Sequence, residues 1–206
     1  MNPPTMGTTT PGVPGNAPMT SALSSWRTRW PRPRVLVLTM TALAMWGIKR
    51  HYANADVADL SWILEPVARL TGLVSGVTFE WEAGSGYLCR ERFFVIAKPC
   101  AGVNFLLAAF GMVAFLLSDR ARSLRTSAGL TLISLTIAYM AAIGANTLRI
   151  AVALAIAAHP LTSAWLTAAR IHRFEGVAVY FGMLALLHLG VQRFTASRQG
   201  AAWAEG

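Results

Sequence analysis

The sequence predicts an all-α protein: a polytopic integral membrane helical bundle with a short extracytoplasmic loop. Of its 206 residues, 54% are hydrophobic and only 13% are charged, well below the usual quarter or so. The apolar residues gather in long runs, and short clusters of arginine flank those runs. The net charge of +9 is therefore explained by membrane orientation, because basic residues favour the cytoplasmic side. No soluble basic face indicates nucleic acid as a partner.

Residues 1–33 are rich in proline, glycine and threonine, so we expect a disordered cytoplasmic leader. A first span is predicted at 35–48, directly after a cluster of arginines that ends at Arg34. This run also resembles a secretory signal with a cleavage site at Ala53-Asn54-Ala55. We favour an uncleaved span, because the leader is long and basic residues precede the supposed cut. Both interpretations place residue 56 outside the cytoplasm.

Three further spans are predicted at 101–118, 129–146 and 174–190, each close to the length that a bilayer requires. The basic cluster at 119–125 and the C-terminal arginines belong on the cytoplasmic side. Residues 80–100 and 150–172 then face the envelope. The expected organisation is a leader at 1–33, a membrane-embedded domain at 34–195 and a cytoplasmic tail at 196–206. The predicted location is the bacterial inner membrane.

Two apolar stretches are too polar or too short to cross alone. Residues 60–79 contain Glu65, Pro66 and Arg69, which favours an interfacial or partly embedded helix over a full span. If this stretch does cross, the orientation upstream of it is reversed and the leader lies outside. Residues 150–158 either extend the third span or re-enter the outer leaflet. Between these stretches, 80–99 is predicted as an outer loop with a glycine-rich turn at 84–86 and a strand-like segment at 92–97.

Three reactive residues lie at the predicted outer ends of the apolar runs, namely Cys100, Arg149 and His172. Cysteine is nucleophilic as the thiolate, which a neighbouring cation stabilises, and Cys100 is expected to open a helix whose dipole adds to that effect. Histidine exchanges protons near neutral pH, and arginine stabilises an oxyanion. Together they indicate acyl transfer by a cysteine enzyme, without metal or cofactor.

At these residues the chain resembles the exosortase/archaeosortase family. The matching blocks are Pro99-Cys100-Ala101-Gly102-Val103-Asn104-Phe105, Asn146-Thr147-Leu148-Arg149-Ile150 and His172-Arg173-Phe174-Glu175-Gly176. The resemblance implies a thiol protease or transpeptidase that cleaves C-terminal sorting signals, each made of a short motif, one transmembrane helix and a basic tail. It implies Cys100 as nucleophile, His172 as acid and base and Arg149 as transition-state stabiliser, supported by Gly102, Asn104 and Asn146. The chain is shorter than common exosortases, as in the compact exosortase K branch.

Cys89 lies eleven residues before Cys100, and an oxidising envelope could join the two in a disulfide. Two other function classes are considered. A non-catalytic scaffold would use Arg149 and His172 to bind lipid phosphates, with membrane lipids as its partners. A transporter would place charges inside the spans, and the spans here are nearly free of them.

Overall fold

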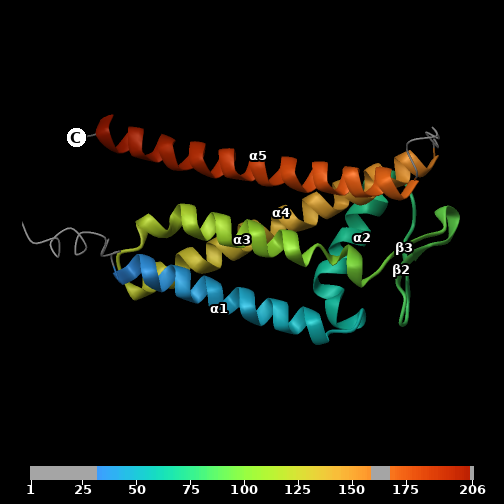
Figure 1. The fold of residues 1–206 in the computed structure, drawn as a ribbon. Coiled ribbons are helices and arrows are strands. Elements are labelled where there is room, and N and C mark those ends of the chain that lie inside the picture. The colour runs from blue at the N-terminus through green and yellow to red at the C-terminus, as the bar shows by residue number, and fades with distance from the viewer. Residues whose placement is uncertain (1–31, 159–167, 205–206) are drawn as a thin grey trace, which may run out of the picture. The chain divides into compact units, whose positions relative to one another are not determined.

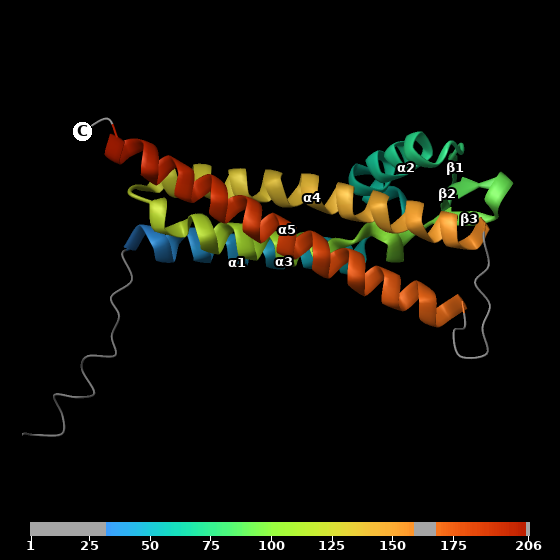
Figure 2. The same cartoon turned by 90° about the horizontal axis from the view of Figure 1, so that it is seen from above.

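The computed structural model describes residues 32–158 and 168–204, so nearly all of the predicted leader lies outside the described residues. Five α-helices account for most of this part of the chain: α1 (Arg32–Asn54), α2 (Ser61–Ser75), α3 (Val103–Leu117), α4 (Leu124–Ala158) and α5 (Ala168–Ala204). In both views α1, α3, α4 and α5 run lengthwise, whereas α2 lies at one end of the bundle (Figures 1 and 2). The predicted all-α bundle is confirmed.

Three segments of the described chain are long and apolar enough to cross a membrane: Lys98–Arg120, Leu124–Ala157 and Phe174–Ser197. They correspond to the second, third and fourth predicted spans. The predicted first span lies in α1, a helix of 23 residues that is not among them. Its apolar run at 35–48 extends only about 21 Å, against a hydrocarbon thickness of about 30 Å.

Helix α4 resolves the two alternatives for residues 150–158, because it continues without a break for 35 residues. Those residues extend the third span. Arg149 consequently lies inside a helix, nine residues before its end, and not at the end of one as the sequence predicted. At 1.5 Å per residue α4 is about 52 Å long, so it exceeds the thickness of a hydrocarbon layer.

The core of the bundle centres on α3, which packs against both α1 and α4. Leu106, Phe110 and Val113 of α3 are almost completely buried. Two buried hydroxyl groups on α4 bond within their own helix: Thr131 Oγ1 donates to the Ser127 carbonyl at 3.0 Å, and Ser134 Oγ donates to the Leu130 carbonyl at 2.7 Å. The helix thus carries polar residues into the core without leaving these hydroxyls unpaired.

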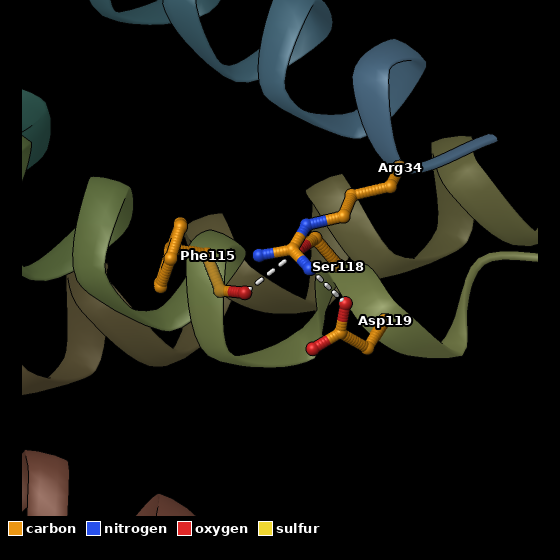
Figure 3. Close-up of polar contacts among 4 residues, drawn as sticks. All are labelled: Arg34, Phe115, Ser118 and Asp119. Atoms are coloured by element: carbon orange, nitrogen blue, oxygen red, sulfur yellow. Dashed lines mark hydrogen bonds and ion pairs between the residues drawn. The ribbon is translucent and has the colours of Figure 1, made fainter. Parts of the chain in front are cut away.

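The start of α1 is joined to the end of α3 by an ion pair between Arg34 and Asp119 (Figure 3). The Arg34 guanidinium carbon also lies 5.2 Å from the centre of the Phe115 ring. Asp119 belongs to a single 3-10 turn, Ser118–Arg120, which ends the α3 segment at the basic cluster. Because Asp119 is well exposed, we expect the pair to contribute at most about 1 kcal/mol.

At the opposite end of the bundle, the loop before α3 forms a small antiparallel sheet of three strands in the order β1-β2-β3. Its strands are β1 (Glu80–Glu82), β2 (Gly86–Cys89) and β3 (Phe94–Ile96). Trp81 pairs with Tyr87, and Leu88 pairs with Val95. Strand β3 falls within the predicted segment 92–97, whereas β1 and β2 were not predicted. One residue after β3, the chain enters the turn that carries Cys100.

Two substitutions on α3 distinguish the stability that comes from core packing from the stability that comes from a surface contact. We expect Phe110→Ala, at a side chain with no exposed surface, to lower the free energy of unfolding by about 3–5 kcal/mol, because it leaves a cavity in the core. Phe115→Ala on the same helix is the control: its ring is 50% exposed, and we expect a loss of about 1 kcal/mol or less. Unfolding in detergent micelles measures both. Equal losses would contradict the assignment of the core to this face of α3.

Candidate functional site

Cys100 lies in a 3-10 turn of four residues, Lys98–Ala101, which precedes α3. The Cys100 amide donates to the Ala97 carbonyl at 2.8 Å, and Gly102 then turns the backbone into the left-handed region at φ 62°. Helix α3 begins at Val103. The sequence predicted that Cys100 would open the helix; instead it lies three residues ahead of the first helical residue, because Gly102 breaks the helical path.

The Cys100 turn is attached to the end of α1 by polar contacts. Lys98 Nζ donates to the Ala55 carbonyl at 2.7 Å, and Tyr52 Oη donates to the Lys98 carbonyl at 3.3 Å. Lys98 Nζ also lies 5.2 Å from the centre of the Tyr52 ring. The Cys100 side chain is half-buried, which leaves part of it accessible from outside the bundle.

Asn146 of α4 packs directly against Gly102. Its side chain is 1% exposed, and a Cβ atom at Gly102 would lie 2.6 Å from Asn146 Oδ1, far inside van der Waals contact. Gly102 is therefore required twice, once for its φ angle and once for this close approach. Within the described residues Asn146 Nδ2 is buried and lacks a hydrogen-bond partner, which is uncommon away from functional sites.

Arg149 and Asn146 are linked through Tyr180 of α5. Arg149 Nη1 donates to Tyr180 Oη at 3.1 Å, and Tyr180 Oη in turn donates to Asn146 Oδ1. The Arg149 guanidinium carbon lies 5.4 Å from the centre of the Tyr180 ring. Asn146 in turn contacts Gly102, two residues after Cys100. The hydroxyl thus brings Arg149 and Asn146 together with the Cys100 turn, although 49 residues separate Cys100 from Arg149.

Sequence reasoning missed Tyr180. A signal was present, because Tyr180 carries the hydroxyl of an otherwise largely apolar span and follows Gly176 by four residues. Residues four apart lie on one side of a helix. Without the fold, however, a single tyrosine in a span has no identifiable partner.

Gly176 lets α5 approach α4 at the site. It is buried, and a Cβ atom there would lie 3.1 Å from Arg149 Nε. His172 lies one helical turn before Gly176, in the second turn of α5. The structure therefore describes the helical backbone of His172, and its side chain lies outside the described part of the chain.

The remaining predicted residues fall in two other places. Asn104 is exposed and accepts a hydrogen bond from Lys49 Nζ of α1 at 2.7 Å, so it faces α1 while Asn146 faces Tyr180. Cys89 is completely buried in the sheet, and both cysteines are free, so the disulfide considered from the sequence is not formed. Among the described residues, no cluster of three or more histidine, cysteine or acidic side chains could hold a metal ion.

The described site therefore joins a half-buried thiol, a fixed guanidinium, a tyrosine hydroxyl and a buried carboxamide. A nucleophile beside a cation and hydrogen-bond donors is the arrangement that acyl transfer requires. Comparison of the chain with family models, with curated proteins and with solved structures finds no match.

The contact between Gly102 and Asn146 can be tested with a matched pair of glycines. Gly76 ends α2 at φ 66° and has open space around it, so Gly76→Ala measures backbone strain alone. Gly102→Ala has the same strain and also displaces Asn146. We expect its loss of unfolding free energy, measured in detergent, to exceed that of Gly76→Ala by about 1–3 kcal/mol. Similar losses would mean that Asn146 moves freely.

Proposed function

We propose that this chain is a membrane cysteine peptidase or transpeptidase of the exosortase/archaeosortase type. It cleaves the C-terminal sorting signals of exported proteins at the outer face of the membrane. The observation that carries the proposal is a chain of contacts that joins the Cys100 turn to Arg149, from segments far apart in the sequence: Gly102 contacts Asn146, and both Asn146 and Arg149 bond the Tyr180 hydroxyl. Two of the three residues that the family resemblance implies thus belong to one cluster.

The third residue is His172, and its position on α5 supports its inclusion in the proposed site. Gly176 packs against Arg149, and His172 is four residues earlier on the same side of α5, about 6 Å along the axis. His172 is thus one turn nearer than Gly176 to the start of α5, and α5 starts at the end of the bundle that carries the small sheet (Figure 1).

In the proposed reaction the Cys100 thiolate attacks the carbonyl carbon of the scissile peptide bond. The carbonyl electrons move to oxygen, and Arg149 stabilises that oxyanion. The bond to nitrogen then breaks while His172 donates a proton to the leaving amine. The products are a thioester on Cys100 and the released tail with its transmembrane helix. Water or an acceptor nucleophile, deprotonated by His172, attacks the thioester carbonyl carbon. The carbon–sulfur bond breaks, the acyl group leaves as a carboxylic acid or on the acceptor, and the Cys100 thiolate and protonated His172 are restored.

The same proposal places the bundle in a bacterial inner membrane as a multi-pass protein. Three helices that are long and apolar enough to cross a membrane support the membrane location. The basic cluster at 119–125 lies at the end of the bundle opposite the sheet and the Cys100 turn (Figure 1). Because basic flanks favour the cytoplasm, that end faces inward and the Cys100 turn faces the envelope.

This orientation predicts the outcome of reporter fusions. Alkaline phosphatase, which is active only outside the cytoplasm, should be inactive when fused after Arg125 and active when fused after Gly84 in the β1–β2 turn. Enzyme activity per amount of fusion protein in the membrane is measured. An active fusion after Arg125 would mean that this end of the bundle faces outward, and that the Cys100 turn does not lie at the outer face of the membrane.

The catalytic prediction concerns the host that encodes this chain. With Cys100→Ala in place of the native chain, one or more envelope proteins should keep a C-terminal motif, helix and basic tail that are otherwise removed, since no other group replaces a thiolate nucleophile. Mass spectrometry of C-terminal peptides identifies these proteins. His172→Ala should have the same effect, and so should Arg149→Lys, because an ammonium group cannot reproduce the planar guanidinium.

Cys89→Ala is the matched control for this experiment. Cys89 is buried in the sheet, so its loss should leave cleavage of the same proteins intact. If Cys100→Ala inserts normally and every tail is still removed, the cysteine mechanism is wrong. A non-catalytic scaffold that binds lipid phosphates through Arg149 then becomes the better explanation.

A further inference from the structure

We propose that the Tyr180 hydroxyl is the positioning group of this site. It holds the Arg149 guanidinium in the cluster that adjoins the Cys100 turn, and it fixes the axial position of α5, and therefore of the His172 backbone, against α4. This inference rests on the proposed function and deepens it by adding a residue that acts through the others.

The first argument is the bonding of the hydroxyl. Tyr180 Oη accepts from Arg149 Nη1 and donates to Asn146 Oδ1, so it uses its donor and an acceptor position together. Arg149 and Asn146 are three residues apart on α4 and therefore lie on one face of that helix. The hydroxyl consequently bonds two side chains of α4. These bonds fix the orientation of the Tyr180 hydroxyl, of the Arg149 guanidinium and of the Asn146 carboxamide.

The second argument concerns the freedom of Arg149. An arginine near the edge of a membrane normally extends its charged end to the lipid headgroups. Here the guanidinium instead lies over the Tyr180 ring, at 5.4 Å from its centre, and bonds the hydroxyl of the same residue. Because that hydroxyl also bonds Asn146, which contacts Gly102 two residues after Cys100, holding Arg149 at Tyr180 keeps its charge in the cluster that adjoins the Cys100 turn.

The third argument concerns the register of α5. Only 11% of its apolar segment is buried inside the bundle, against 56% for the segment that contains α3. Apolar contacts do not specify the height of so peripheral a helix, because lipid is as apolar as the helix surface. Polar contacts do specify it: Tyr180 at the site and, fifteen residues later, Thr195, whose carbonyl accepts from Arg120 Nη2 at 3.2 Å.

The contribution of the Tyr180 hydroxyl can be measured separately from that of its ring. The Tyr180 ring packs on Phe105 with 5.2 Å between centres, and phenylalanine would keep that contact. Tyr180→Phe therefore removes only the two hydrogen bonds. Tyr139→Phe is the matched control, because Tyr139 also reaches from one helix to another, donating to the Trp62 carbonyl at 2.6 Å, and lies outside the cluster.

The first measurement needs no substrate. In a Cys89→Ala background, Cys100 in membranes is alkylated with iodoacetate, an anion, and separately with iodoacetamide, which is neutral. The ratio of the two rates, taken per inserted chain, reports positive charge beside the sulfur and does not depend on the amount of folded protein. We expect Tyr180→Phe to lower this ratio roughly threefold to tenfold, as Arg149→Gln does, with no further fall in the double variant.

The second measurement is the rate of tail removal from a substrate found by comparing native and Cys100→Ala hosts. We expect Tyr180→Phe to lower it roughly tenfold to a hundredfold, the effect of displacing a catalytic group by about 1 Å. Tyr139→Phe should change neither measurement. If Tyr180→Phe leaves both the ratio and the rate unchanged while Cys100→Ala abolishes cleavage, the positioning role is wrong and the proposed function stands. If Cys100→Ala still cleaves, the proposed function itself fails.

Discussion

The close approach of Asn146 to Gly102 is the constraint on which the candidate site depends. It brings the middle of α4 against the residue that joins the Cys100 turn to α3, where no side chain larger than hydrogen fits. The same carboxamide accepts from Tyr180 and so connects this junction to α5. One buried polar side chain thereby relates three helices to the reactive thiol, in a region where the surrounding contacts are apolar and tolerate sliding.

The helices differ in how firmly the bundle holds them. Helix α3 is surrounded, and its large side chains Leu106 and Phe110 are nearly or fully buried. Helix α5 is peripheral and exposes large apolar side chains along much of its described length, among them Phe174, Val177, Phe181, Leu186, Leu189 and Phe194. A peripheral helix that contributes to the candidate site needs a specific polar contact with the rest of the bundle, here with Arg149 and Asn146 of α4. The hydrogen bonds of Tyr180 provide it.

The small sheet contributes to the site because it fixes the position at which the chain enters the Cys100 turn. Strand β3 leads through Ala97 into the Cys100 turn, and Lys98 fastens the turn to the end of α1. Cys89 pairs with Phe94 within the sheet and is fully buried, so it packs as a small apolar side chain. The two cysteines therefore differ in environment: Cys89 is enclosed by the sheet, and Cys100 is half-buried.

The sequence by itself determined the elements whose signal is local. The apolar runs located α3, α4 and α5, their ends singled out Cys100 and Arg149, and the family resemblance added Gly102 and Asn146, which lie in the same cluster. The tertiary structure alone decided that α4 continues past Arg149, that Asn104 faces Lys49, and that Tyr180 completes the cluster. The physical reason is that periodicity and composition report whether a segment is apolar, whereas a hydrogen bond between helices depends on their relative height and rotation, which no single segment encodes.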